Sequence, residues 1–155
     1  GYNVGYTPIV SYHYGAENHM ELTNVLMKSI LILTGMGVVL TAFGQWIAEP
    51  FGKAYIGYDP ALLAMTIHGL RIDILLFLFC PINMLASSFF TALNNGPLSA
   101  LISTNRTFLC QLFCIVILPQ FLQLDGIWLS NVIAEILALC LAVPALLVMR
   151  KKYHY

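Results

Sequence analysis

The chain has 155 residues, of which 59% are hydrophobic and only 9% are charged, and its formal net charge is zero. A mean hydropathy of +0.82 lies outside the range of soluble globular domains. The absence of net charge gives no reason to expect nucleic acid as a partner. These values exclude an ordinary soluble domain and predict a protein surrounded by a lipid bilayer.

Four apolar stretches are long enough to cross a bilayer, because a hydrocarbon core of about 30 Å needs about 20 helical residues. The Asn-Asn-Gly-Pro turn signal at 94–97 separates two of them. The first apolar residues are too few to cross and are interpreted as the end of a fifth helix. The predicted fold is an all-α transmembrane bundle with helices at about 1–14, 22–48, 61–93, 98–119 and 125–149, followed by a tail at 150–155.

Short connections at 49–60 and 119–125 are expected between these helices. Asp59 followed by Pro60 is typical of a capped helix start with proline in its first turn. Small residues in the first full crossing favour close packing of another helix against it. They are Gly35, Gly37 and Gly44.

Basic residues near the helix ends predict the orientation in the membrane. Lys28, Arg106 and the basic run at 150–152 belong to one side, whereas Lys53 belongs to the other. The side with more basic residues is expected to be cytoplasmic. The prediction is a multi-pass protein of the cell membrane with a cytoplasmic C-terminal tail and 94–97 turn, and with 49–60 and 119–125 facing outward.

Four charged residues fall inside the predicted crossings and are the main candidates for functional groups. A charge costs about 2.5 to 3.5 kcal/mol at the centre of a membrane helix, whereas a leucine or phenylalanine returns only about 0.3 to 0.6 kcal/mol. These side chains are therefore expected to face the bundle interior or water. They are Arg71, Asp73, Arg106 and Glu135.

Depth along the helices narrows the pairing of these charges. Arg71 and Glu135 each lie about ten residues from a helix start on the outer side, or about 15 Å deep, near the midplane. Because Arg71 and Asp73 point in different directions on one helix, we expect Glu135 to pair with Arg71 or with Arg106. Asp73 is then the less compensated carboxylate and the better candidate for a proton or cation site. If its helix starts deeper, Arg71 and Asp73 are instead snorkelling charges at the outer interface.

The string Gly-x-x-Pro-x-x-Ser-Tyr-x-Tyr-Gly-Ala-x-Asn at 5–18 ends the first helix. Pro8 removes a backbone donor from this helix, and Gly15 allows the chain to leave it. Tyr12 suits the headgroup level of the membrane, which favours an interfacial aromatic belt. The alternative is that Pro8 and Tyr12 mark a helix bend facing a substrate cavity.

This string resembles the motif at the same place in the second half of the multidrug and toxic compound extrusion (MATE) family, although Thr7 stands where the family usually has glutamine. The family has twelve helices in two six-helix lobes, so the resemblance implies the end of the eighth helix plus helices nine to twelve. Further blocks resemble the family in the same order over nearly the whole chain: GLRI at 69–72, SSFFTALNNGPLSALIS at 87–103 with Arg106 beyond, LDGIWLS at 124–130 and IAEIL at 133–137.

The resemblance implies a secondary transporter that exports cationic or amphipathic drug-like compounds in exchange for protons or sodium by alternating access. Asp73 and Glu135 are the candidate coupling carboxylates, with the transported proton or sodium as the coupling ion and no other cofactor expected. The expected partners are the bilayer, the substrate and the N-terminal lobe of the same polypeptide. A piece of this size is not expected to transport alone.

Some family members carry a cation-binding aspartate in the tenth helix, and the matching position here falls near residues 80–83. The aspartate is not present there, so a sodium site does not carry over directly. Pro81 and Asn83 are instead candidates to bend the helix and to supply polar groups to the cavity, with a simple helix kink as the alternative.

Cysteine and histidine residues add little to this interpretation. Cys110 and Cys114 lie four residues apart, but no histidine or carboxylate accompanies them in the sequence, so no metal site is expected. His68 lies close to Arg71 and ranks below Asp73 as a proton site, because a positive neighbour disfavours its protonation. Three further histidines are expected in water at helix ends: His13, His19 and His154.

Two other functions are weighed against multidrug export. A flippase for a lipid-linked saccharide has a related helical layout, but it would be expected to line its cavity with several basic residues. A membrane-embedded enzyme would be expected to cluster Asp, His or Glu near an interface. The sequence contains no such cluster, so an enzyme is not expected.

Overall fold

The computed structural model describes residues 1–153 and 155. The expectation for His154 therefore lies outside the described residues. All regular structure in the described part of the chain is helical, which confirms the predicted all-α class. The elements are α1 (Tyr2–Gly15), α2 (His19–Ile56), α3 (Pro60–Asp73), the 3₁₀ segment η1 (Ile74–Leu78), α4 (Cys80–Ala92), α5 (Gly96–Thr104), the π-helical segment η2 (Asn105–Cys110) and α6 (Gln111–Tyr153).

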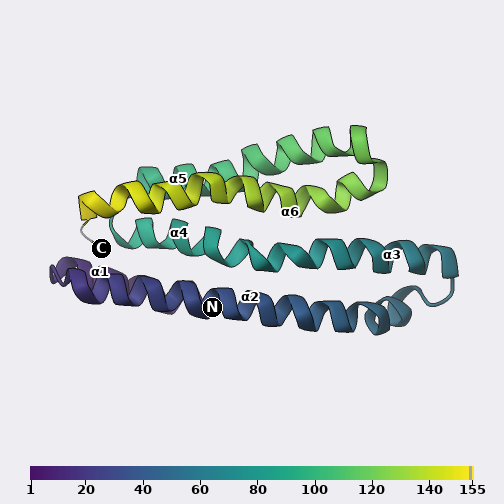
Figure 1. Cartoon of the computed structure of the whole chain (residues 1–155), viewed down its shortest axis with the longest axis horizontal. Coiled ribbons are helices and arrows are strands. Elements are labelled where there is room, and N and C mark those ends of the chain that lie inside the picture. Colours follow the sequence, from purple (N-terminus) through teal and green to yellow (C-terminus); the bar gives the residue numbers. More distant parts are fainter. Residues whose placement is uncertain (154) are drawn as a thin grey trace.

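Three helical segments are long and apolar enough to cross a membrane: His19–Ile56, Pro60–Ala92 and Gly96–Tyr153. The last has 58 residues and contains a non-helical backbone at Gln123, with φ 52° and ψ −125°. The chain reverses there, so that α6 has a first arm (111–122) and a second arm (124–153) that run antiparallel (Figure 1). Together with α1, these segments form four crossings and one shorter helix.

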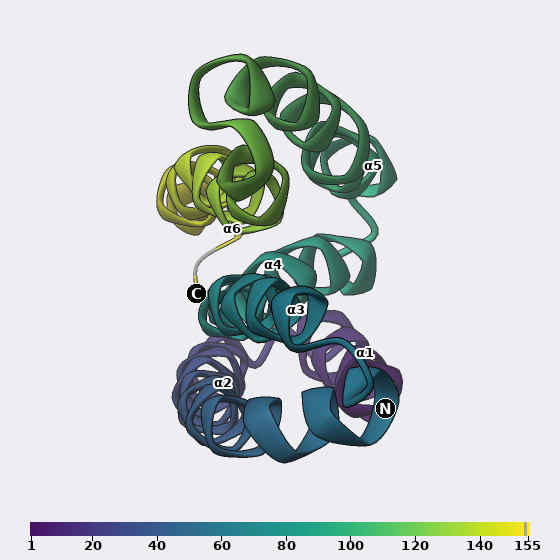
Figure 2. The same cartoon turned by 90° about the vertical axis from the view of Figure 1, so that its right-hand side faces the viewer.

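The helices lie side by side along the long axis of the molecule in three layers. Viewed end-on, α3 and α4 lie between the pair α1 and α2 and the hairpin formed by α5 and α6 (Figure 2). The 57–59 loop and the Gln123 turn lie at one end, and the turn before α5 and the C-terminus lie at the other (Figure 1). We call the first of these the outer end, following the predicted orientation.

Side-chain caps at the starts of α2, α3 and α5 explain where the turns before these helices end. Asp59 Oδ1 accepts hydrogen bonds from the backbone N–H groups of Ala61 (2.9 Å) and Leu62 (3.2 Å), and Pro60 occupies the first turn. This is the cap that the Asp-Pro sequence predicts. Asn18 and Asn95 accept from backbone N–H groups in the same way at the starts of α2 and α5.

The predicted end of the first full crossing at residue 48 is wrong, because α2 continues to Ile56. Pro50 lies inside this helix without ending it. Glu49 and Lys53, one turn apart, form an ion pair at 2.7 Å that supports the added turns. The connection is correspondingly shorter than the predicted 49–60 segment, and α6 likewise runs to Tyr153 rather than to residue 149.

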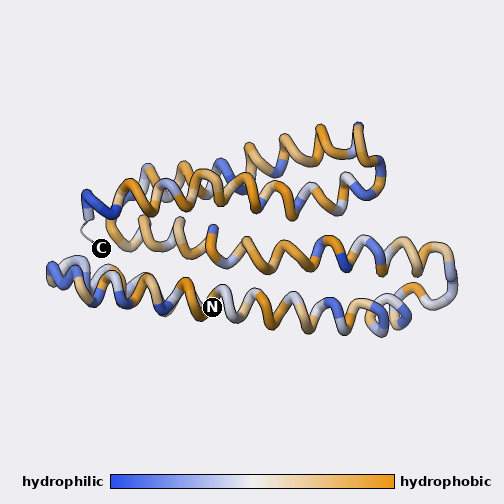
Figure 3. The backbone as a smooth tube through the Cα atoms, in the orientation of Figure 1, coloured by the Kyte–Doolittle hydropathy of each residue, from blue (hydrophilic) through white to orange (hydrophobic). Residues whose placement is uncertain are grey.

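Hydrophobic residues dominate the middle of the bundle (Figure 3), and many of the large ones are exposed. Leu31 and Trp46 are each 75% exposed although they lie in the middle of an apolar helix. A surface of this kind is suited to lipid rather than water. The buried apolar cluster lies where α1, α2, α4 and the end of α6 meet, around Phe89 and Phe90.

Close helix contacts depend on small residues at two levels. A Cβ atom added at Gly37 would lie 2.5 Å from the carbonyl oxygen of Phe77, so α2 approaches η1 closely there. A Cβ atom added at Gly69 would overlap the ring of Trp128, which lies across α3. Gly35, by contrast, faces open space.

Candidate functional site

An ion pair joins η2 to the second arm of α6. The guanidinium Nη1 of Arg106 lies 2.9 Å from Glu135 Oε1, and both side chains are largely buried. The structure thus places Glu135 beside Arg106, the second of the two partners considered from the sequence. Burying both charges demands this close pairing, because an isolated charge in a membrane interior is costly.

Asn83 supplies the second contact to this carboxylate from the central layer. Its Nδ2 donates to Glu135 Oε2 at 2.7 Å and to the Glu135 backbone oxygen at 2.9 Å. The side chain is fully buried, and its Oδ1 has no hydrogen-bond partner among the described residues. Both oxygens of Glu135 therefore face nitrogen donors, one charged and one neutral. We call Asn83, Arg106 and Glu135 the polar triad.

The polar triad lies near the middle of the bundle. Arg106 comes ten residues after Gly96, and Glu135 twelve residues after Gln123, which places each about 15 to 18 Å from opposite ends at about 1.5 Å per residue. The depth estimated for Glu135 from the sequence agrees with this placement. A carboxylate at this level has access to water only through a polar path between helices.

The backbone around the triad is irregular on both sides. Arg106 lies in the π-helical segment η2, a geometry that is rare and often found at functional sites. In the central layer, η1 interrupts the crossing just before Pro81, which lies in the first turn of α4. Pro81 lacks a backbone N–H, so the α-helical hydrogen-bond ladder cannot run through this point unbroken. Discontinuous helices at mid-membrane are typical of sites in transporters.

A second set of polar side chains lies one turn closer to the outer end. Asn131 Nδ2 donates to Asp73 Oδ1 at 2.7 Å, and Gln111 Nε2 donates to Asn131 Oδ1 at 3.2 Å. Asn131 and Glu135 are four residues apart and so lie on the same face of α6. Among the described residues, Asp73 forms no ion pair, which leaves it less compensated than Glu135.

A polar cleft of about 220 Å³ connects the two sets. It is lined from both arms of the hairpin and from η1. The lining residues are Leu76, Arg106, Gln111, Asn131, Ala134 and Glu135.

Arg71 is not part of this arrangement. Its side chain is exposed, and its backbone oxygen accepts a hydrogen bond from Gln45 Nε2 at 2.6 Å. Nearby, His68 Nε2 lies 3.0 Å from Asp125 Oδ1, and both side chains are more than half exposed. The structure thus separates Arg71 from Glu135 and gives His68 an acidic partner on α6.

The first helix keeps Pro8 within a continuous α1, and Pro8 is exposed. Tyr12 is 72% exposed, and its ring contacts the His13 ring edge-on at 5.4 Å. Neither residue lines the polar cleft. Ser11 Oγ donates to the Ala92 backbone oxygen at 3.0 Å, so this helix is tied to α4.

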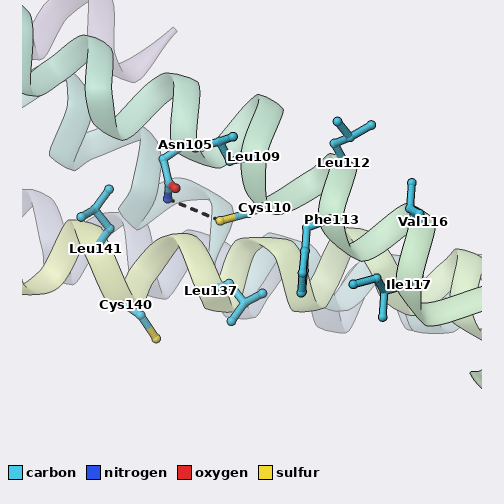
Figure 4. A pocket seen from close by; sticks show the side chains of 10 residues that line it. All are labelled: Asn105, Leu109, Cys110, Leu112, Phe113, Val116, Ile117, Leu137, Cys140 and Leu141. Carbon is cyan, nitrogen blue, oxygen red and sulfur yellow. Dashed lines mark hydrogen bonds between the residues drawn. The ribbon is translucent and has the colours of Figure 1, made fainter.

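Two of the cysteines line an apolar cleft of about 770 Å³ between η2 with the first arm of α6 and the second arm of α6 (Figure 4). Cys110 and Cys140 contribute to its walls, and Cys114 is buried. No group of three or more metal-binding side chains occurs in the described part of the chain. The walls are mainly Leu, Val, Ile and Phe, so this cleft is suited to a hydrocarbon group rather than to an ion.

Reasoning from the sequence missed Asn131 and Gln111 as site residues. The available signal was the spacing of Asn131 from Glu135, which places an amide one turn from a buried carboxylate on the same helix face. Gln111 carries no such signal. Its alignment with Arg106, five residues earlier, depends on the wider turn of the π-helical segment.

Comparison with known proteins identifies the family. The family model MatE matches residues 1–117. The chain belongs to the MATE family. Its members are transporters rather than enzymes, so the alternative of a membrane-embedded enzyme is set aside. A comparison with curated proteins finds no match.

Solved structures of MATE transporters share the fold of this MATE segment. An outward-facing multidrug resistance MATE transporter of the MOP superfamily matches with a TM-score of 0.84 and 21% identity over 98% of this chain and 34% of its own. An inward-facing one matches with a TM-score of 0.85 and 22% identity over 98% and 35%. A MATE crystal structure in complex with MaL6 matches with a TM-score of 0.84 and 21% identity over 98% and 34%. The chain thus spans about a third of the length of these transporters.

Proposed function

We propose that this segment forms most of the C-terminal lobe of a secondary active multidrug exporter, which exchanges cationic or amphipathic compounds for protons. The observation that carries the proposal is the polar triad at mid-membrane, where both helices that surround Glu135 are irregular. A buried carboxylate beside broken helices is the arrangement expected of a coupling site in a transporter.

The contacts of Glu135 favour protons over sodium as the coupling ion. Hard cations prefer oxygen ligands, but Arg106 and Asn83 present nitrogen donors to both carboxylate oxygens. The guanidinium already supplies the positive charge that a bound sodium ion would bring. Protonation of Glu135 would neutralise the acidic partner of Arg106 and weaken the ion pair, which ties both arms of the hairpin together.

Asn83 is suited to both protonation states of Glu135. In the charged state its Nδ2 donates to the carboxylate, as observed. After protonation, rotation of the amide would let its buried and unpartnered Oδ1 accept the new O–H. Oδ1, which has no partner among the described residues in the charged state, would thereby gain a donor when Glu135 is protonated.

Alternating access is supported by the comparison of two conformations. The segment matches an outward-facing and an inward-facing transporter with TM-scores of 0.84 and 0.85. A lobe that fits both equally well is consistent with rocking of nearly rigid lobes around a substrate site. The other side of the substrate site would be formed by the N-terminal lobe of the same polypeptide. In this orientation the C-terminus would lie in the cytoplasm.

The test is transport by the full-length protein in lipid vesicles. A fluorescent amphipathic cation should move against its gradient when an opposing pH gradient is imposed, and a sodium gradient of equal size should not replace it. Uptake driven by sodium alone would contradict the proposed coupling. Absence of any gradient-driven uptake would contradict the proposed transport, and robust uptake by the isolated 155-residue segment would contradict its role as part of a larger transporter.

A further inference from the structure

Polar contacts between the central layer and the second arm of α6 follow one another from the outer end to the middle of the membrane. The outermost joins His68 on α3 to Asp125 at 3.0 Å. The next joins Asp73 to Asn131 at 2.7 Å, and the innermost joins Asn83 to Glu135 at 2.7 Å. Each contact pairs an ionisable group with a polar partner on the facing helix.

The inner two of these contacts are close enough for a single water to bridge, and the outer interval is longer. Asp125, Asn131 and Glu135 are six and four residues apart on α6, or about 9 Å and about 6 Å at about 1.5 Å per residue. Two hydrogen bonds of about 2.8 Å through one water span about 6 Å. The polar cleft lies in this inner interval, since Asn131 and Glu135 both line it.

The cleft has the size and chemistry of a hydrated space. Its volume of about 220 Å³ accommodates several waters at about 30 Å³ each. Asn131, Gln111, Arg106 and Glu135 offer both donors and acceptors to such waters.

We propose that this seam between α3, η1 and α6 is a water-filled access route that carries protons from the outer end to Glu135, with Asp73 as its intermediate carboxylate. A proton arriving from outer water binds the Asp73 carboxylate, which lies beside the cleft and contacts its wall residue Asn131. The proton then passes along hydrogen-bonded water in the cleft to a Glu135 oxygen, which leaves Asp73 charged again. Arg106 stays protonated throughout, because its guanidinium does not release a proton in proteins.

The charged and titratable groups near Asp73 and Glu135 fit proton transfer from the outer end towards Glu135. Glu135 is contacted by Arg106 from η2, and the Cys80 thiol lies 3.6 Å from the same guanidinium nitrogen. Asp73 has an amide rather than a cation as its nearest partner, so it is free to exchange a proton without breaking an ion pair. His68 and Asp125 stand at the exposed mouth. The use of the route for protons rests on the proposed function, whereas its hydration does not.

Water access can be tested by thiol labelling of the full-length protein in a cysteine-free background. Ala134→Cys and Leu76→Cys place a thiol on two walls of the cleft, and Ala138→Cys, one turn further along α6 and buried outside it, is the matched control. A membrane-impermeant methanethiosulfonate added outside should label the two cleft thiols at least about tenfold faster than the control. Labelling as slow as the control, or only from the cytoplasmic side, would overturn the route. If one of the two cleft variants does not fold, the labelling rate of the other still tests the route.

Proton delivery is tested separately with Asp73→Asn in vesicles. Proton-driven transport should fall about tenfold, while exchange of labelled for unlabelled substrate without a gradient should keep its rate and apparent affinity. Equal proton-driven rates in the variant and the unmodified protein would overturn the role of Asp73. If the unmodified protein shows no proton-driven transport, the proposed function fails, and the labelling still decides whether the cleft is a water route.

Discussion

Arg106 Nη1 lies 2.9 Å from Glu135 Oε1. The two residues belong to η2 and to the second arm of α6, which the Gln123 turn separates in the chain. The pair fixes the register of the two arms at mid-membrane. It also pairs two charges at the depth where an unpaired charge is most costly in a membrane. Loss of the charge on Glu135 would therefore remove an attraction that holds the two sides of the hairpin together.

The first prediction concerns the stability of the ion pair. Glu135→Leu or Arg106→Leu alone leaves one largely buried charge without its partner and should lower the free energy of unfolding by about 3 kcal/mol. The double variant should recover most of this loss, because it removes both charges. Thermal unfolding of the full-length protein in detergent measures the effect. Additive losses in the double variant would show that the two charges are not coupled.

The second prediction concerns the helix break before Pro81. Pro81→Ala restores a backbone donor and favours a continuous helix, so stability should stay unchanged or rise by up to about 1 kcal/mol, the value of one added hydrogen bond. Transport should fall about tenfold, equivalent to about 1.4 kcal/mol in the barrier, because the break beside the polar triad is lost. Initial uptake rates in vesicles measure this change.

Pro97→Ala is the matched control for Pro81. Pro97 also lies in the first turn of a helix, but Asn95 caps that helix and the proline is remote from the triad. Transport by this variant should match the unmodified protein. An equal loss in both variants would assign the effect to proline removal in general rather than to the break.

The third prediction concerns the packing of α3 against α6. Gly69→Ala places a Cβ atom on the Trp128 ring, and such overpacking should cost about 1 to 3 kcal/mol. Gly35→Ala, which meets open space, should be neutral or stabilising by about 0.5 to 1 kcal/mol. Melting temperatures of the two variants test the difference. A Gly69→Ala protein as stable as Gly35→Ala would mean that the two helices are further apart than observed.

Much of the fold follows from the sequence because a bilayer restricts the options. The length of an apolar run, the Asn-Asn-Gly-Pro turn and the Asp59 cap lie in local sequence and are confirmed in the structure. The extension of α2 to Ile56 was missed, because Pro50 and the glycines that follow it indicate a loop, whereas the Glu49–Lys53 pair and helix packing maintain the helix.

The site was less predictable, because it depends on which helices are neighbours. A constant rise per residue gave the depth of Glu135, but the choice between Arg71 and Arg106 required knowledge of the hairpin at Gln123. The contact of Asp73 with Asn131 likewise depends on α3 lying against α6. The π-helical turn at Arg106 has no signature in composition or period.

The most direct measurement of the central claim compares the full-length protein with its Glu135→Gln variant in vesicles, under either a pH gradient or a sodium gradient. The glutamine keeps the size of the side chain but cannot take up a proton. We predict that the pH gradient drives uptake of an amphipathic cation by the unmodified protein and that the variant loses this response, whereas substrate binding remains. Unchanged pH-driven uptake by the variant, or uptake that follows sodium in both proteins, would contradict the assignment of Glu135 as the proton-coupling carboxylate.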